Sequence, residues 1–391
     1  MNLFSDDVRR NPYPLYEQIR SASPLLRDPQ SGLWMIFDYD GVKRVLNDPG
    51  TFSSRHGPAE WLIFVDPPRH TKVRALIALA FTPRSVANLE PRIRELSRQL
   101  LDQSIERGEM DLAADYAIPL PLMVIAEMLG IPLADRPRFK RWNDVILNMS
   151  YTVIGSEGAA EAAREFAAVT VEMNEYLTGL LKERREAPRD DLLTRLLEAK
   201  VDGERLTQQE ILGFFQLLLL AGSETTTNLI NNAILCFVEN PGELSRLKAS
   251  AELLPSAIEE VLRYRAPFQW MFRLAMCDVE LHGQVVPAGN LVLAMMGSAN
   301  HDPRQFPEPG RFDITRDPNP HLGFGHGIHF CLGASLARLE SRIALSDLLE
   351  RLKGFELASN VPWEPRKGLN VHGPNRLPIR FEPGRRAAAG A

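Results

Sequence analysis

The residues best suited to chemistry lie in one short stretch near the C-terminal end, at 324–333. A single cysteine, Cys331, stands there among three glycines, and the helical pattern of residues 334–340 follows directly. A cysteine just before a helix lies near backbone N–H groups and the positive end of the helix dipole, which favours the metal-binding thiolate. Zinc and iron–sulfur sites need several ligands, so a single axial thiolate to a haem iron remains. The alternative is an ordinary glycine-rich loop with a buried structural cysteine.

The sequence also predicts a long buried helix over 207–240. Thr207 and Glu210 form the pattern of a capping box at its start, and Pro241 marks its end. At 1.5 Å per residue the helix is about 50 Å long. Its middle, 214–220, is apolar nearly all round, which indicates burial on every side.

A polar break follows in that helix at 221–227, where a glycine, a carboxylate and three threonines occur. Glycine and β-branched threonine are poor helix formers, and a buried carboxylate needs a partner. In one interpretation, Thr225 bonds a backbone carbonyl and bends the helix, while Glu224 pairs with an arginine. In the other, the alcohol and the carboxylate behind it pass protons through water to reduced O2 beside a haem.

Both stretches resemble motifs of the cytochrome P450 family. The spacing of Phe324, Gly327, Cys331 and Gly333 is similar to the family's haem-binding signature, in which the cysteine is the iron ligand. The run 221–225 resembles the oxygen-activation motif Ala-Gly-x-Asp/Glu-Thr in its Glu form, where the glycine leaves room for O2.

Two further motifs of the same family occur in the expected order. Glu260 and Arg263 stand three apart on a predicted helix, so they meet on one face. They resemble the family's Glu-x-x-Arg pair, and Arg311 matches the third member of that network, although Gly310 replaces the usual acidic residue. The resemblance implies a structural trio that holds the Cys331 loop in shape and touches no substrate.

A haem brings two propionates, which need cations or hydrogen-bond donors when buried. His70 and Arg74 share one helix face, and Arg273 and His329 fall where the family places the other partners. By the resemblance, the residues that contact haem b are His70, Arg74, Ala221, Arg273, Phe324, His329, Cys331 and Gly333.

The resemblance covers essentially the whole chain and implies a haem-thiolate monooxygenase, with Thr225 and Glu224 managing protons. It would activate O2 and insert one oxygen atom, by hydroxylation or epoxidation, into a hydrophobic small molecule such as a terpenoid, steroid or fatty acid. Because no flavin or nicotinamide fingerprint is present, electrons are expected from a ferredoxin with its NAD(P)H-dependent ferredoxin reductase, docking near Arg69, Lys72 and Arg338. A peroxide-driven oxygenase and a haem-based sensor without turnover are the alternatives.

Mostly apolar and aromatic side chains fall where the family lines its substrate pocket. The segments are 58–64, 149–154, 217–225, 267–272 and 371–375, and the candidate pocket residues are Trp61, Phe64, Met149, Leu217, Phe268, Trp270 and Met271. Such a lining favours neutral hydrophobic molecules, although core packing would give the same composition. His372 and Arg376 are the cations that could instead hold a carboxylate.

Composition indicates one compact domain over 1–391, with 385–391 as a loose tail, because no linker, charge block or internal repeat divides the chain. Charged residues make up 24% and hydrophobic residues 45%, as in globular proteins. The net charge of −5 argues against nucleic-acid binding. Three scattered cysteines favour a reducing compartment, and no signal or membrane anchor opens the sequence. We therefore expect a cytoplasmic monomer that is not bound to membranes.

The periodicity predicts a fold that is mainly α with a small β lobe (α+β). Helices are predicted at 12–22, 39–46, 69–80, 89–106, 119–129, 134–148, 159–184 and 190–200, with a loop at 148–158. Strands of one small lobe are predicted at 33–37, 266–275, 279–286, 291–296 and 377–381. The resemblance implies the cytochrome P450 fold, a triangular helical lobe whose haem lies between the long central helix and the proximal helix after Cys331.

Overall fold

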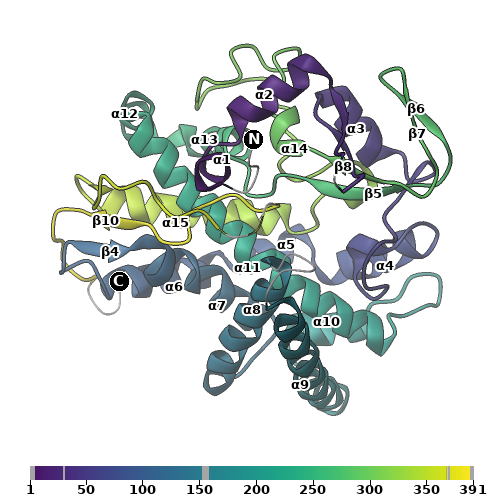
Figure 1. Cartoon of the computed structure of the whole chain (residues 1–391). Helices are drawn as coiled ribbons and strands as arrows, with labels where there is room; N and C mark the ends of the chain where they lie inside the picture. Colours follow the sequence, from purple (N-terminus) through teal and green to yellow (C-terminus); the bar gives the residue numbers. More distant parts are fainter. Residues whose placement is uncertain (1–4, 30, 152–157, 367, 369, 388–391) are drawn as a thin grey trace.

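The computed structural model describes residues 5–29, 31–151, 158–366, 368 and 370–387. It is mainly helical, with small sheets at the side, as predicted (Figure 1). The helices are α1 (Asp6–Arg10), α2 (Tyr13–Ala22), α3 (Tyr39–Asn47), α4 (Arg69–Ala80), α5 (Pro83–Ala87), α6 (Glu90–Asp102), α7 (Pro119–Met128), α8 (Arg136–Tyr151), α9 (Ala159–Glu186), α10 (Leu192–Glu198), α11 (Gln208–Glu239), α12 (Pro241–Ala249), α13 (Leu254–Tyr264), α14 (Met296–Ala299) and α15 (Ala334–Arg351). Single turns are η1 (Leu62–Phe64), η2 (Ala113–Ala117), η3 (Leu133–Asp135), η4 (Ala251–Leu253) and η5 (Gly327–His329).

Within the described ranges, the strands form three separate sheets. Their bounds are β1 (Leu25–Arg27), β2 (Trp34–Ile36), β3 (Phe52–Ser53), β4 (Glu109–Asp111), β5 (Met271–Ala275), β6 (Val279–Leu281), β7 (Gln284–Val286), β8 (Leu291–Ala294), β9 (Glu356–Leu357) and β10 (Pro378–Arg380). The largest sheet has the order β1-β2-β8-β5-β3, so the predicted strands at 33–37, 266–275 and 291–296 do share one sheet.

Two predicted members of that sheet lie elsewhere, which corrects the prediction of a single β lobe. Strands β6 and β7, within 279–286, pair only with each other around a turn at His282 and Gly283, both with positive φ. Strand β10, within 377–381, pairs antiparallel with β4 and β9. Its partner at Glu109–Asp111 lies in a stretch for which the periodicity predicts no strand.

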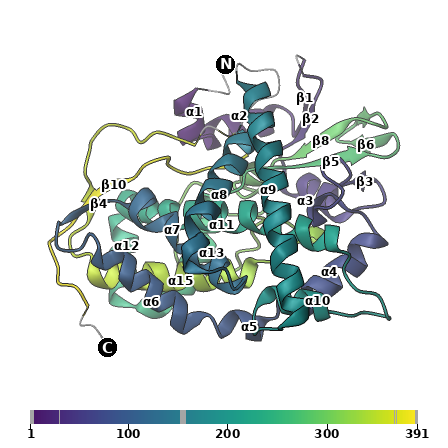
Figure 2. The ribbon, with the colours of Figure 1, turned by 90° about the horizontal axis from the view of Figure 1, so that it is seen from below.

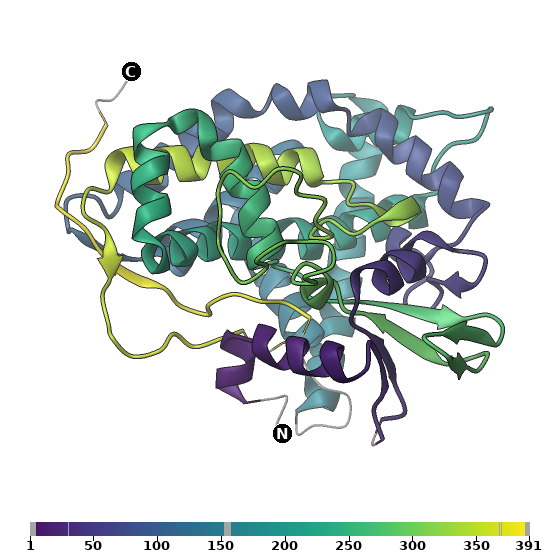
Figure 3. The ribbon, with the colours of Figure 1, turned by 90° about the horizontal axis from the view of Figure 1, so that it is seen from above.

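Helix α11 has the capping box that the sequence predicts. The Thr207 hydroxyl accepts from the Glu210 backbone N–H at 3.2 Å, and the Glu210 carboxylate accepts from the Thr207 N–H at 2.8 Å. The helix packs against α7, α8, α13 and α15. Helices α8 and α9 lie side by side (Figure 2), and α15 lies on the opposite side of the molecule from the N-terminal helices (Figure 3). The helix predicted to be buried therefore runs through the centre of the helical region.

The N-terminal helices contact a late segment of the chain, at residues 363–372. Arg9 Nη1 donates to the Arg366 carbonyl at 3.2 Å, and Arg10 Nη1 donates to the Trp363 carbonyl at 3.1 Å. The His372 ring bonds the Arg10 carbonyl at 3.0 Å. The N-terminal helices thus hold the segment around Arg366 in place.

Most other helix boundaries differ from the prediction by a turn or less, but α6 ends at Asp102 instead of 106, and strand β5 begins at Met271 instead of 266. Helix α8 continues to Tyr151, beyond the predicted end at 148, and the rest of the predicted loop, 152–157, lies outside the described residues. In the predicted tail, Arg386 pairs with Glu106 at 3.0 Å. Within the described ranges, no helix is both long and apolar enough to cross a bilayer.

Candidate active site

The Cys331 loop is tightly closed and ends at the start of α15. The Cys331 N–H donates to the Phe324 carbonyl at 2.9 Å, which joins the two sides of the loop. Gly327 has a φ of +71°, and a Cβ there would lie 2.9 Å from the Leu46 carbonyl, so glycine is required for both conformation and space. A Cβ built on Gly333 would lie 4.0 Å from the cysteine sulfur. The glycines of the motif therefore let the loop present one sulfur at a fixed position.

The electrostatics at the sulfur differ from the simple helix-dipole expectation. Burial raises the pKa of the Cys331 thiol, while the Gly333 N–H and the nearby guanidinium groups of Arg74 and Arg338 lower it. Burial is the larger effect, so the loop by itself does not favour the thiolate. Coordination to a metal reverses this balance, because a coordinated thiol is deprotonated outright.

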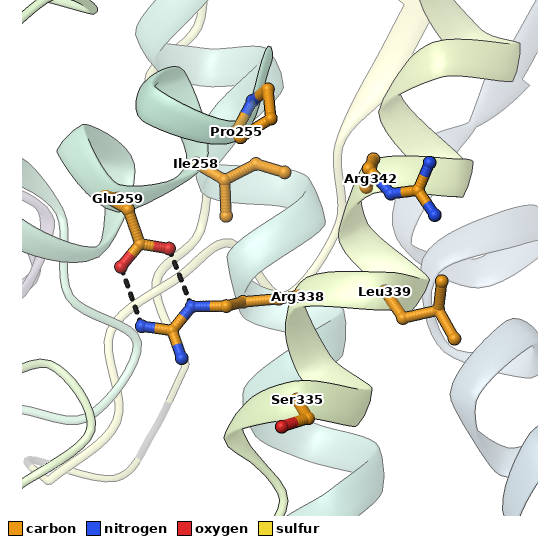
Figure 4. A pocket seen from close by; sticks show the side chains of 7 residues that line it. All are labelled: Pro255, Ile258, Glu259, Ser335, Arg338, Leu339 and Arg342. Carbon is orange, nitrogen blue, oxygen red and sulfur yellow. Dashed lines mark hydrogen bonds and ion pairs between the residues drawn. The ribbon is translucent and has the colours of Figure 1, made fainter. Parts of the chain in front are cut away.

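The outer side of this loop carries arginines that already have partners. Arg338 on α15 donates to both carboxylate oxygens of Glu259 on α13, each at 2.7 Å (Figure 4), and its guanidinium lies 4.5 Å from the Phe324 ring centroid. Arg74 Nη2 donates to the Phe330 carbonyl at 2.7 Å. A cavity of about 250 Å³ beside Cys331 lies between these two arginines. Arg74, predicted to face a propionate, thus bonds the backbone beside the cysteine.

The other two predicted docking residues are also paired. Lys72 Nζ contacts Glu204 at 2.5 Å, and Arg69 contacts both Glu204 at 3.3 Å and Glu210. These pairs are largely exposed, so each contributes little to the free energy of folding. A partner protein would have to compete with these carboxylates for Arg69 and Lys72.

Three predicted propionate partners, His70, Arg273 and His329, lie together with several nitrogens unused, although Nε2 of His329 lies 3.0 Å from the Ser54 hydroxyl. The His70 and His329 rings lie 4.3 Å apart. Within the part of the chain that the structure describes, neither ring nitrogen of His70 has a partner, nor does Nδ1 of His329. Among those same residues, Arg273 is 2% exposed and forms no ion pair, and its Nη1 donates to the carbonyl of its neighbour Phe272 at 2.7 Å. Burial lowers the pKa of His70 to about 4, of His329 to about 3 and of Arg273 to about 10.

This cluster fits the haem predicted above. A buried guanidinium and buried imidazole N–H groups without an anion are costly, and carboxylates are the groups that would satisfy them. His329 stands two residues before Cys331, so the same loop can serve both the iron and a propionate. The residues present therefore match a flat cofactor with a central metal and acidic edges.

The polar break in α11 contains the structural bond that one interpretation predicts. The Thr225 hydroxyl donates to the Ala221 carbonyl at 2.7 Å. Ala221 is exposed and Thr225 is half-buried, whereas most of this helix is buried, so this face of α11 is the accessible one.

Glu224 does not have the arginine ion pair that the same interpretation includes. Among the residues that the structure describes, its Oε1 has no hydrogen-bond partner, and Arg366 acts on it only through its charge. Burial raises the pKa of Glu224 to about 8, against a smaller opposing effect of the Arg366 charge. The side chain is therefore largely protonated near neutral pH and can act as a proton donor.

The buried ion pair behind the cysteine loop has a different third member from the one predicted. Arg263 donates twice to Glu260, at 2.8 Å each, and both side chains are 0% exposed. Arg316, not Arg311, places its Nε 3.3 Å from the Glu260 carboxylate. Arg311 points outward to Glu308 at 3.4 Å and contributes only its carbonyl, which accepts from Arg263 at 3.0 Å.

The reason for this correction lies in the path of the loop after Pro309. Three backbone carbonyls, those of Asn300, Pro309 and Arg311, accept from Arg263. With its carbonyl turned inward, Arg311 has its side chain turned to solvent. The sequence signal that would have found Arg316 is a second arginine five residues on, after the predicted motif.

The predicted pocket residues divide into two groups. Trp61 and Leu217 are buried in the main core, where the Trp61 indole donates to Gln216 at 3.1 Å, and Met149 is half-buried in the last turn of α8. Phe268 and Met271 pack against the core beneath the five-stranded sheet, and Trp270 packs against a small cluster near α2.

Two aromatic residues connect these groups: Phe272, which ends the predicted segment 267–272, and His56, which the prediction did not include. His56 lies 4.8 Å from the Phe64 ring centroid and 5.5 Å from that of Phe272, which in turn lies 4.8 Å from that of Trp270. Trp61 stacks on Phe64 at 6.1 Å. The loop at 56–64 and strand β5 therefore share one aromatic wall.

The family model and the relatives found by comparison all belong to one family. The cytochrome P450 family model matches residues 25–252 and 248–371. The chain is 40% identical over 389 residues to cytochrome P450 109 of Bacillus spizizenii, covering 97% of this chain and 94% of the relative. It is 38% identical over 408 residues to cytochrome P450 monooxygenase PikC of Streptomyces venezuelae, covering 99% and 95%.

The fold of this chain matches that of a solved structure over nearly the whole length of both chains. CYP109E1 from Bacillus megaterium in complex with testosterone is 40% identical, with a TM-score of 0.89, and the match covers 95% of this chain and 99% of that one. Fold, motif order and family model coincide, so the chain belongs to the cytochrome P450 family and is a monooxygenase that binds haem b.

Proposed function

We propose that this enzyme inserts one oxygen atom from O2 into a neutral hydrophobic molecule, with Cys331 as the axial ligand of the haem iron. The observation that carries this assignment is the cluster of His70, Arg273 and His329, in which both His70 nitrogens and Nδ1 of His329 lack a partner among the described residues and the buried Arg273 has no ion pair. His329 stands two residues before Cys331, the only cysteine of the loop. We further propose a cytoplasmic monomer that receives its electrons from a ferredoxin, itself reduced by an NAD(P)H-dependent reductase.

When bound, the haem supplies O2 activation and oxygen transfer, and the protein supplies orientation and protons. Thr225 donates its own hydroxyl proton to the Ala221 carbonyl at 2.7 Å, so its oxygen lone pairs are free to accept from water on the accessible face of α11. Glu224, one residue before it, holds a proton near neutral pH because burial raises its pKa to about 8. The acid stores the proton and the alcohol positions the water that receives it.

Thr225→Ala tests this division of roles. The variant should bind haem and substrate normally, because the Thr225 hydroxyl donates its hydrogen bond within its own helix. Product formation should fall on the order of 10²-fold, the lower range for general acid–base catalysis, while NADPH consumption continues and hydrogen peroxide accumulates. The measurement is product and peroxide formed per NADPH with ferredoxin and reductase. Thr226→Val, at the neighbouring buried position, is the matched control, and unchanged coupling in Thr225→Ala would contradict the role.

The preference for neutral substrates follows from the contacts that the two cations able to bind a carboxylate already make. Arg376 forms an exposed ion pair with Asp111 at 2.8 Å. Burial lowers the pKa of His372 to about 3, so its ring is neutral, and one of its nitrogens bonds the Arg10 carbonyl. Neither is free to compensate a buried acid. The relative solved with testosterone holds an uncharged steroid, which supports the same class.

A terpenoid alcohol should therefore bind better than a fatty acid of similar carbon count. Burying an unpaired carboxylate costs several kcal/mol, against about 8 kcal/mol for the whole binding free energy of a micromolar ligand. We expect the Kd of the acid to be at least about 100-fold higher, which is roughly 2.7 kcal/mol. The haem absorption change on titration gives both constants. Tighter, productive binding of the acid, lost in Arg376→Ala, would assign the anchor to Arg376 instead.

A further inference from the structure

A row of buried polar side chains extends along α11 from Glu224. Asn228 follows it by one turn and Asn231 by two, so the three share one face of the helix. Asn228 and Asn231 are 0% exposed, and among the described residues neither the oxygen nor the nitrogen of either amide has a hydrogen-bond partner. Asn232, beside them, donates to the carbonyls of Arg265 and His372 at 3.0 and 2.9 Å, so the row faces the segment that contains His372.

The opposite wall comes from the C-terminal part of the chain. A Cβ built on Gly373 would lie 2.5 Å from Asn228 Oδ1, so only glycine leaves room there. The Gly373 carbonyl accepts from the Arg366 N–H at 3.0 Å. Arg366 also provides the positive charge that acts on Glu224, and its Nε is buried without a partner in the described part of the chain. One buried polar region, here called the polar seam, is therefore enclosed by four residues: Glu224, Asn228, Arg366 and Gly373.

This polar seam leads to the surface. Arg366 Nη1 donates to Asn375 Oδ1 at 3.2 Å, and the Asn375 amide donates to the Glu364 carboxylate at 3.3 Å. Glu364 is exposed, Asn375 and Arg366 are half-buried, and Glu224 and Asn228 are buried. The polar groups thus become progressively more buried on the way from solvent to the carboxylate of Glu224, the residue before Thr225.

Unpartnered buried amides and carboxylates are rare in proteins, and ordered water is what usually satisfies them. Here Glu224 Oε1, both polar atoms of Asn228 and Nε of Arg366 offer acceptors and donors around one place. Water needs two to four such partners to be held. A dry apolar cavity, by contrast, would not be lined by these polar groups.

We propose that the polar seam holds ordered water and is the route by which protons from solvent at Glu364 and Asn375 recharge Glu224, with Asn228 and Arg366 as positioning residues. This rests on the proposed function, in which Glu224 supplies protons to Thr225. Each proton that Glu224 gives up is replaced by one from the seam water, which takes one from bulk water in turn. Asn228 and Arg366 hold the water and do not themselves change protonation.

The first test reads proton exchange and does not need turnover. The infrared carbonyl band of protonated Glu224, identified by its loss in Glu224→Gln, is followed in the haem-loaded enzyme near pH 7 after transfer to D2O. Asn228→Leu keeps the branched shape, with a somewhat larger volume, but removes both polar atoms, and should slow the deuterium shift on the order of tenfold or more. Asn228→Ser, which keeps a polar group, should restore faster exchange. Thr227→Val, whose hydroxyl bonds the Ala117 carbonyl outside the seam, is the matched control.

Arg366→Met is the second variant, because this half-buried position tolerates change more readily than the core. It should slow exchange in the same direction. A crystal structure of the wild type should contain ordered water between Asn228 and Arg366. Exchange at the wild-type rate in both variants, or a seam without water, would overturn the proposal.

Coupling measurements separate this inference from the proposed function. Asn228→Leu and Arg366→Met should lower product per NADPH and raise the solvent isotope effect, with substrate Kd unchanged. If Glu224→Gln remains fully coupled, the proton role of Glu224 fails and the seam has nothing to recharge. If Glu224→Gln uncouples while Asn228→Leu does not, only the seam is wrong.

Discussion

Replacement of Cys331 by alanine or histidine is expected to abolish the red-shifted Soret band of the ferrous carbon monoxide complex. That band requires a thiolate opposite the bound gas, and Cys331 is the cysteine that the closed loop and α15 present together. Product formation should fall to background in the same variants, because the axial thiolate is what favours O–O cleavage. The ferrous–CO spectrum of haem-loaded protein is the measurement.

The other two cysteines provide the controls for this experiment. Cys236 is fully buried in α11, and Cys277 is exposed after β5. Cys277→Ser and Cys236→Ala should keep the band, although the second creates a small cavity and should lower stability. A red-shifted band that persists in haem-loaded Cys331→His would refute the ligand assignment.

Arg263→Ala should be the most destabilising of three arginine substitutions around Glu260. Its removal leaves a carboxylate with 0% exposure and without its bidentate partner, which costs about 3–5 kcal/mol. Arg316→Ala removes the contact to Glu260 at 3.3 Å and the hydrogen bonds to the carbonyls of Pro307, Glu308 and Arg311, from a side chain that is 10% exposed, so about 1–3 kcal/mol is expected. Arg311→Ala should stay within about 0.5 kcal/mol, because its side chain is 57% exposed.

Guanidinium titration of the holoprotein, followed by circular dichroism and haem absorbance, ranks the three variants. Haem content after purification should fall in the same order, because the buried network supports the loop that carries Cys331. Equal destabilisation by Arg311→Ala and Arg316→Ala would show that Arg311 belongs to the network after all.

The features that the sequence predicted well depend on residues close together in the chain. The capping box of α11, the glycines around Cys331 and the pairing of Glu260 with Arg263 each involve short spacings, whose geometry is fixed by a helix turn or a tight loop. Such motifs predict the same local geometry whichever fold surrounds them.

The features that it missed depend on contacts between distant segments. Whether Arg311 or Arg316 reaches Glu260 is decided by the path of an irregular loop, and residue type alone cannot distinguish them. The partner of β10 at Glu109–Asp111 is a three-residue strand, too short to show a period. His56 became visible as part of the aromatic wall only once the 56–64 loop lay against β5.

The bond between Arg9 and the Arg366 carbonyl joins residues 357 positions apart, and this has a consequence for how the protein is made. A ribosome releases the N-terminal helices first, yet their partners at Trp363, Arg366 and His372 are among the last residues to emerge. Likewise, one edge of strand β2 stays unpaired until β8, its parallel partner, has been synthesised. During synthesis the early segments therefore expose apolar surface and an unpaired strand, the conditions under which nascent chains aggregate or need chaperones. Excess chaperone during synthesis should therefore raise the yield of folded enzyme.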